Sequence, residues 1–113
     1  MTDPVFVLQS HAADFVSRDI GRLLREQLLQ LEIAIPEDQR ITIDASGVVI
    51  MTPSFVDEFF GRTAALLGLE RFQSRFHIVG IDGENRTLVN NVVRNRLILH
   101  RRSGVGGSAV DVE

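Results

Sequence analysis

The sequence predicts a single α/β domain with a mixed, mostly parallel four-stranded sheet, one face of which is partly open. Segments with strand patterns and segments with helix patterns alternate along the chain, which is typical of a sheet whose strands are joined by crossover helices. The 113 residues are enough for one domain with one core. A composition of 44% hydrophobic and 24% charged residues is that of a globular protein and excludes wholesale disorder.

The first part of the chain predicts two short strands and a helix. Residues 5–8 are β-branched or otherwise apolar and favour a strand, and residues 14–16 predict a short return strand that completes a hairpin. Ser17 is a good N-cap, because its hydroxyl can accept a hydrogen bond from a first-turn amide. The apolar residues of the helix recur on one face, namely Ile20, Leu23, Leu24, Leu28 and Leu31. The helix is expected to end before Pro36.

The middle of the chain predicts a second strand and a second helix. Residues 41–45 alternate between apolar and polar, and the polar positions 42 and 44 indicate a partly open sheet face. Proline is favoured at the first helical position, so Pro53 marks a helix start with either Thr52 or Ser54 as its cap. The helix carries a broad apolar stripe of Phe55, Val56, Phe59, Phe60, Leu66 and Leu67. Gly68 is a plausible stop for this helix.

The last part predicts a third strand, a third helix and a tail. Residues 76–81 are almost continuously apolar, which indicates a strand buried on both faces. After a turn at positions 82–83, Val89, Val92, Val93 and Leu97 follow helical spacing as far as residue 98. We therefore expect a domain over residues 1–102 and a flexible, glycine- and serine-rich tail over residues 103–113.

The composition argues against most catalytic and cofactor chemistry. The chain has no cysteine, so disulfides, thiolate metal sites and a cysteine nucleophile are excluded. It has no lysine for a phosphate-binding loop, and its three histidines are far apart in sequence. We therefore expect no cofactor and no metal. No apolar stretch approaches the ~20 residues that span a bilayer, and residues 1–4 do not resemble a secretion signal, so a cytoplasmic location is expected.

Two alternative functions remain open at this stage. Asp44 ends a strand, where α/β proteins often place functional groups, and with a nearby hydroxyl at position 52 or 54 it would suit a small enzyme or a ligand-binding domain. Asp44 would equally suit a turn that bonds its own backbone amides. A basic group of Arg94, Arg96, Arg101 and Arg102 would suit nucleic acid, although a net charge of −3 argues against it.

Two hydroxyl-bearing residues flank Pro53 at the start of the second helix. Unpaired amides and the helix dipole favour negative charge at such a position. A phosphate on Ser54 would therefore be tolerated by its own helix while adding nearly two negative charges to the surface. The other interpretation is that these hydroxyls only cap the helix.

Residues 41–48 (ITIDASGV) and 54–61 (SFVDEFFG) resemble the STAS-like family, which is related to the STAS domains of bacterial anti-sigma factor antagonists. The sequence FVSR at 15–18, with Gly21 and the leucines at 23–24, is similar to the Ser-Arg helix start of the same family. The resemblance covers residues 5–98 and implies a mixed sheet with helices packed mainly on one face. It also implies a non-enzymatic regulatory module that docks onto a protein partner.

The resemblance implies a partner and a switch as well. In the better-known antagonists the partner is an anti-sigma factor with a kinase-type ATPase fold, which phosphorylates a serine or threonine at the start of the helix after the second long strand. Here Pro53 stands at the usual acceptor position and Phe55 replaces a glycine, so phosphorylation would have to move to Ser54 or Thr52. We expect docking through residues 48–58, with Asp57 and Glu58 as an acidic rim. The full set of expected partner-binding residues is Asp44, Thr52, Ser54, Phe55, Asp57 and Glu58. Whether the domain also forms a homodimer is left open.

Overall fold

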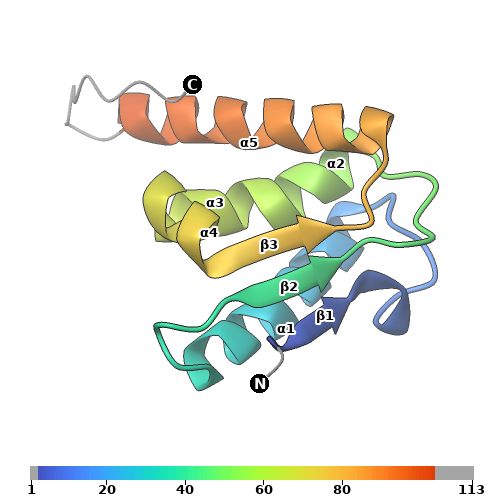
Figure 1. The fold of residues 1–113 in the computed structure, drawn as a ribbon. Helices are drawn as coiled ribbons and strands as arrows, with labels where there is room; N and C mark the ends of the chain where they lie inside the picture. The colour runs from blue at the N-terminus through green and yellow to red at the C-terminus, as the bar shows by residue number, and fades with distance from the viewer. Residues whose placement is uncertain (1–2, 104–113) are drawn as a thin grey trace.

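The computed structural model describes residues 3–103, with side chains described as far as residue 98 (Figure 1). Its strands are β1 (Val5–Val7), β2 (Ile41–Asp44) and β3 (Phe76–Val79). A 3-10 turn, η1 (Leu8–Ser10), follows β1, and α1 (Arg18–Ala34) joins β1 to β2. Between β2 and β3 lie α2 (Pro53–Val56), the π-helical turn η2 (Asp57–Gly61), α3 (Arg62–Leu67) and α4 (Leu69–Arg75). The last helix, α5, spans Gly83–Ser103.

The three strands of the described residues form a parallel sheet in the order β1-β2-β3. Phe6, Ile43 and Ile78 lie side by side in its register. The prediction of a mixed, four-stranded sheet is wrong for this part of the chain, because residues 14–16 form no strand. Phe15 is instead buried against Phe55, and its carbonyl accepts a hydrogen bond from the amide of Thr52. Tertiary packing therefore outweighs the local strand preference of this segment.

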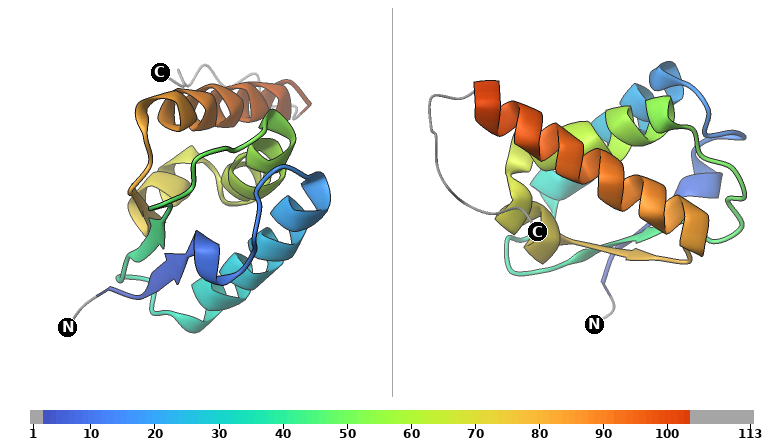
Figure 2. Two further views of the ribbon diagram at one scale, coloured as in Figure 1. Left: turned by 90° about the vertical axis from the view of Figure 1, so that its right-hand side faces the viewer. Right: turned by 90° about the horizontal axis from the view of Figure 1, so that it is seen from above.

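All the helices lie on one side of the sheet, as the resemblance implies. Figure 1 and the left view of Figure 2 show α1, α2 and α3 covering the same face, with α5 packed over the η2–α3 segment. On the open face, Val5, Thr42 and His77 lie side by side across the three strands. His77 is exposed. The prediction that this strand is buried on both faces is therefore wrong, because no helix of the described residues covers the second face.

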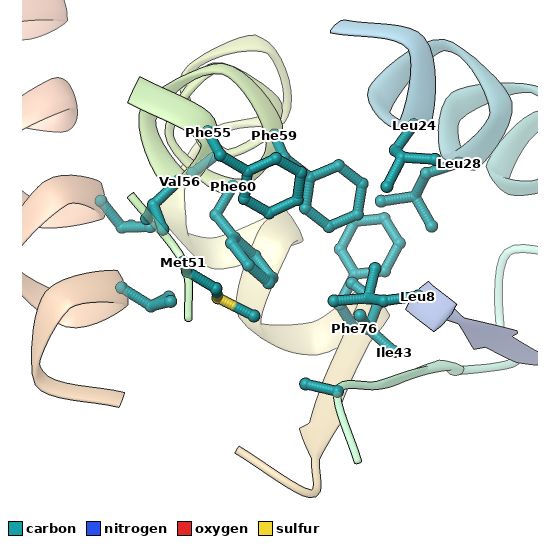
Figure 3. Close-up of a cluster of buried hydrophobic side chains, with 14 of the residues drawn as sticks. Leu8, Leu24, Leu28, Ile43, Met51, Phe55, Val56, Phe59, Phe60 and Phe76 are labelled. Atoms are coloured by element: carbon teal, nitrogen blue, oxygen red, sulfur yellow. The ribbon is translucent and has the colours of Figure 1, made fainter. Parts of the chain in front are cut away.

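Phenylalanines form the centre of the core, shown in Figure 3. Phe55, Phe59 and Phe60 are at most 1% exposed. The ring of Phe59 lies 5.6 Å from that of Phe55, 4.7 Å from that of Phe60 and 6.1 Å from that of Phe6, measured between centroids. Ring pairs at these separations add to the stabilisation that burial alone provides. Leu24 and Leu28 of α1 and Ile41 and Ile43 of β2 belong to the same cluster.

The second predicted helix begins after Thr52 and ends at Gly68, as predicted, but it is not a continuous α-helix between these residues. Thr52 is the N-cap, since its hydroxyl accepts a hydrogen bond from the Phe55 amide, and Gly68 ends α3 with a φ of 87°. A π-helical turn interrupts the helix between these signals. Such turns insert one extra residue into the hydrogen-bond pattern of an α-helix and are frequent at functional sites. The following helix, α4, has no counterpart in the sequence-based prediction.

The third predicted helix is confirmed and is longer than predicted. The carboxylate of Asp82 accepts a hydrogen bond from the Asn85 amide, which caps the start of α5. The helix continues to Ser103, beyond the expected end at residue 98. Apart from Ser103, the predicted flexible tail lies outside the described residues.

Gly21 allows α1 to approach the second helix closely. A Cβ at this position would lie 2.7 Å from the Cβ of Glu58 and 3.0 Å from the carbonyl oxygen of Phe55. Both distances are too short, so a side chain would force the two helices apart. The sequence FVSR–x–x–Gly therefore positions α1 directly against the turn that carries Glu58.

Replacing Gly21 with alanine is expected to lower the free energy of unfolding by about 1–2 kcal/mol, because overpacking outweighs the gain in helix propensity. Urea denaturation followed by circular dichroism measures the loss. Gly83→Ala is the matched control, since an added Cβ there meets no atom within 4 Å. Equal stability of the two variants would contradict the close approach of the helices.

Candidate functional site

The candidate site combines the loop after β2, the loop before α1 and the first turn of α2. The Thr52 hydroxyl donates to the carbonyl of Val16 at 2.8 Å, which ties the two loops together. The amide nitrogen of the buried Asn85 donates to the carbonyls of Val48 and Val49 at 3.4 and 3.2 Å. Contacts from the loop before α1 and from α5 therefore hold the loop at residues 48–52 in place, although it contains no regular structure.

Three aliphatic side chains are exposed on these loops. Val49 is 78% exposed, Ile50 is 66% exposed and Val16 is 47% exposed. Neighbouring residues Val48 and Met51 are buried, so the loop is anchored through one set of apolar side chains and presents another. Apolar side chains grouped on a fixed surface are typical of protein interaction sites.

Next to these loops, four arginines surround the two carboxylates of η2. Asp57 receives hydrogen bonds from Arg96 at 2.6 and 3.0 Å and from Arg18 at 2.9 Å. Glu58 lies 2.7 Å from Arg25, 3.2 Å from Arg18 and 3.2 Å from Arg62. We call Arg18, Arg25, Arg62 and Arg96 the arginine cluster. Four positive guanidinium groups face two negative carboxylates. The arginine cluster, Asp57 and Glu58 together therefore carry a net charge of +2.

The expected acidic rim is therefore wrong. Asp57 and Glu58 are adjacent in sequence and look acidic on their own, but α1 and α5 bring arginines to both carboxylates. Side-chain exposure of 21% for Asp57 and 10% for Glu58 leaves little of either carboxylate to a partner, whereas Arg18 is 55% exposed. The surface beside Ser54 is cationic.

The arginine cluster sets the ionisation of both carboxylates. Burial by itself would raise the pKa of Asp57, but hydrogen bonds from Arg96 and Arg18 outweigh it, so the pKa lies below its ordinary value. Burial also opposes ionisation of Glu58, and Arg25, Arg62 and Arg18 together hold the pKa of this carboxyl below its ordinary value. Both groups are therefore ionised at neutral pH.

A carboxylate whose pKa is lowered by folding stabilises the fold above its unfolded pKa and loses that effect as the pH falls through its folded pKa. We expect the native protein to be more stable than D57N/E58Q at pH 7, and the difference to shrink towards about pH 3. Urea denaturation at both pH values measures this. The control D38N/E26Q changes two exposed carboxylates that have no ion pair within the described residues. A stability difference that does not shrink in acid would contradict the ion-pair account.

Ser54 and Thr52 have different environments. The Thr52 hydroxyl both donates to Val16 and accepts from the Phe55 amide, so it is fully engaged in the structure. The Ser54 hydroxyl has no hydrogen-bond partner among the described residues, and its side chain is partly exposed. Ser54 lines a shallow hollow of about 330 Å³ together with Arg18, Asp57 and Arg96. Ser54 therefore shares this hollow with two arginines.

Two of the expected partner-binding residues lie elsewhere in the structure. Phe55 is completely buried, because it belongs to the phenylalanine core, so its side chain is not part of the surface. Asp44 accepts a hydrogen bond from the amide of Ser46 at 2.9 Å. The bonds from Ser46 lower the pKa of Asp44, and the carboxylate acts as a turn-forming group. Asp44 lines none of the five hollows described for this surface.

The basic group proposed for nucleic acid is divided between different roles. Arg96 is bound to Asp57, whereas Arg94 is exposed on α5. The side chains of Arg101 and Arg102 lie outside the described part of the chain.

A family model described as a STAS-like domain of unknown function matches residues 21–86. The chain belongs to this STAS-like family. The matched segment of the STAS-like domain begins in α1 at Gly21 and ends in the first turn of α5, so it contains β2, the loop at residues 48–52, Ser54 and both carboxylates of η2. No curated protein and no solved structure matches the chain.

Among residues 3–103 of the STAS-like domain, no helix has the length and apolar character needed to cross a membrane. No three histidine, aspartate or glutamate side chains of the described residues are close enough together to hold a metal ion.

The sequence analysis correctly predicted Ser54 at the start of the second helix, but it did not predict the arginine cluster. One signal was available, since Arg18 and Arg25 are seven residues apart and therefore share a face of α1. Arg96 comes from a helix about forty residues away, and no local pattern connects it with Asp57. The i,i+4 pair of Glu58 and Arg62 is the one part of the cluster that local spacing predicts.

Proposed function

We propose that this STAS-like domain is a regulatory interaction module that docks a protein partner through the surface formed by Val16, Val49, Ile50, Ser54 and Arg18. Membership of the STAS-like family supports an interaction module in general. The observation that supports this surface most strongly is the loop at residues 48–52. It is fixed by Asn85 and Thr52 and yet presents Val49 and Ile50 to solvent.

The chemistry of the surface indicates the chemistry of its partner. Two aliphatic side chains on a fixed loop suit a shallow apolar pocket, which would bury them at little entropic cost. The excess positive charge beside them suits acidic residues at the rim of that pocket, because opposite charges steer association and suppress other partners. In line with the family resemblance, we propose a protein with a kinase-type ATPase fold as the partner.

We further propose that Ser54, and not Thr52, is the residue through which docking is controlled. A phosphate on Thr52 would break the two hydrogen bonds that join the loops and cap α2. A phosphate on Ser54 would break none that the described residues make. It would add nearly two negative charges beside Arg18 and Arg96 and would occupy the positive surface that acidic partner residues need.

The test uses the purified full chain with purified kinase-type ATPases from the same organism and ATP. Gel filtration reports complex formation, and intact-mass spectrometry reports phosphate transfer. We expect one phosphate on the native chain and none on Ser54→Ala, with Thr52→Ser as a control that keeps the capping hydroxyl. Ser54→Glu is expected to weaken the complex, whereas Ser54→Ala is expected to keep it.

The two parts of the proposal fail separately. A complex without phosphate transfer would overturn control through Ser54 and leave docking in place. Phosphate found on Thr52 would also overturn the assignment of Ser54. Absence of both complex and phosphate across the candidate ATPases would contradict docking to this class of partner.

A further inference from the structure

A hollow of about 420 Å³ lies beside the one that Ser54 lines, and Arg96 contributes to both. We call it the arginine hollow, and its lining consists of Arg25, Arg62, Ala65, Leu66 and Arg96. The three arginines come from α1, α3 and α5. Figure 2 shows α1 and α5 on two sides of the η2–α3 segment, and both helices contact η2. The fold therefore brings three positive side chains from distant parts of the chain to one hollow.

Gly61 allows α5 to bring Arg96 close to η2. A Cβ at residue 61 would lie 3.0 Å from the Oδ1 of Asp57 and 3.6 Å from the Cβ of Arg96. Asp57 in turn accepts two hydrogen bonds from Arg96, from Nε at 3.0 Å and from Nη2 at 2.6 Å. A side chain at residue 61 would crowd this pair, so the glycine keeps the guanidinium of Arg96 beside the start of α3.

The carboxylates of η2 bind only part of each guanidinium group. Nη1 of Arg25 donates to the carboxylate and to the carbonyl of Glu58, at 2.7 and 2.9 Å. Nε of Arg62 lies 3.2 Å from the same carboxylate. Nη2 of Arg25, both terminal nitrogens of Arg62 and Nη1 of Arg96 make no hydrogen bond to any described residue. The hollow therefore offers donors whose side chains are already held in place, which lowers the entropic cost of binding a ligand.

We propose that the arginine hollow binds the phosphate group of a small phosphate monoester. The arginine cluster, Asp57 and Glu58 together carry a net charge of +2, and a phosphate monoester carries nearly two negative charges at neutral pH. Its three terminal oxygens accept hydrogen bonds from several directions, whereas the two oxygens of a carboxylate lie in one plane. Three guanidinium groups on different helices therefore suit a phosphate better than a carboxylate.

The remaining space suits the organic part of the ligand. A volume of about 420 Å³ falls within the range of roughly 300–1,000 Å³ that is typical of small-molecule sites, and a phosphate group alone would fill only part of it. Leu66 lines the hollow and is 66% exposed, so an apolar group attached to the phosphate would remove apolar surface from water. Val49 and Ile50 do not line this hollow, and the inference does not rest on the proposed docking.

The test is a nuclear magnetic resonance titration of the isotope-labelled full chain with phenyl phosphate at neutral pH, with the ionic strength held constant by sodium chloride. We expect the Nε–H signals of Arg25, Arg62 and Arg96 and the amide signal of Leu66 to shift together and to saturate. Inorganic phosphate, which lacks the apolar group, is expected to bind at least about threefold more weakly. Benzyl alcohol, which lacks the phosphate, is expected to cause no saturable shift.

Two variants and a control locate the site. Arg62→Gln is expected to weaken phenyl phosphate binding at least about tenfold, because it removes a charged donor. Leu66→Glu is expected to weaken it as much, because it places a negative charge in the hollow and leaves every arginine in place. Both side chains are on the surface, so both variants are expected to fold. The matched control is Arg22→Gln, which removes an exposed arginine of α1 that lines none of the five hollows and should change binding by no more than about twofold.

Three results would overturn the inference. Shifts that do not saturate, or an equal loss of binding in Arg22→Gln and Arg62→Gln, would show a response to general positive charge and not a site. Native affinity of both Arg62→Gln and Leu66→Glu would place the ligand outside the arginine hollow. Inorganic phosphate that binds as tightly as phenyl phosphate would contradict a monoester as the ligand. No partner protein is present in this titration, so these results leave the proposed docking unaffected.

Discussion

Replacing Arg75 with methionine is expected to lower the free energy of unfolding by about 3–5 kcal/mol, the cost typical of breaking a buried charged network. Arg75 ends α4 and is only 3% exposed. One of its terminal nitrogens donates to the carbonyls of Glu32 and Ile35, both at 2.6 Å, and the other donates to those of Pro36 and Gln39. Its Nε lies 3.3 Å from the buried carboxylate of Glu32.

Arg75 therefore terminates α1 from another helix. The last turn of α1 has no basic residue of its own, and the last carbonyls of a helix lack partners within it. The guanidinium satisfies the carbonyl of Glu32 in the last turn, that of the C-cap Ile35 and two more in the following turn. It also places a positive charge at the negative end of the helix dipole. Methionine fills much of the same volume but leaves the four carbonyls without these donors and removes the positive charge 3.3 Å from the Glu32 carboxylate.

Urea denaturation measures the effect, with Arg94→Met as the matched control. Arg94 is exposed on α5, so its replacement is expected to change stability by no more than about 0.5 kcal/mol. If the methionine variant does not fold, Arg75→Lys provides the measurement, because lysine keeps the charge but has fewer donors and no planar geometry. A lysine or methionine variant as stable as the control would contradict the capping role.

Replacing Phe59 with alanine is expected to cost about 3–5 kcal/mol, because the side chain is fully buried and its removal leaves a cavity. The ring lies between Phe55, Phe60 and Phe6, and so connects the second helix with β1. Phe59→Leu, which keeps most of the volume, is expected to cost much less.

Leu66→Ala is the control for this prediction. Leu66 lies in α3 of the same helical segment but is 66% exposed, so its truncation is expected to change stability by no more than about 0.5 kcal/mol. Comparable losses for the two alanine variants would mean that the phenylalanine cluster is not the centre of the core.

The elements that the sequence predicted well are those with strong local signals. Ser17 caps α1 as expected, since its hydroxyl accepts a hydrogen bond from the Ile20 amide. Thr52, Pro53 and Gly68 mark the limits of the second helix correctly. In each case the decisive interaction joins residues within one turn, so it can be read from a short stretch of sequence.

The features that the sequence could not predict depend on distant contacts. The segment around Phe15 looked like a strand, but the core binds its side chain and Thr52 binds its carbonyl. Asp57 and Glu58 looked like an acidic surface because their arginine partners come mostly from α1 and α5. For the same reason Phe55, which stands next to a surface serine, could be assigned to the core only once the packing was known.

The central claim is that the fixed loop with Val49 and Ile50 docks a protein partner. The most direct measurement is the dissociation constant, by isothermal titration calorimetry, between the kinase-type ATPase identified by gel filtration and the native chain or V49D/I50D. The proposed docking predicts that the double variant binds at least about 100-fold more weakly, because two apolar anchors are replaced by charges of the same sign as the acidic residues expected on the partner. Ile33→Asp, which changes an aliphatic side chain 81% exposed near the other end of α1, is predicted to bind as the native chain does. Native-like affinity of V49D/I50D, with folding confirmed by circular dichroism, would contradict the claim.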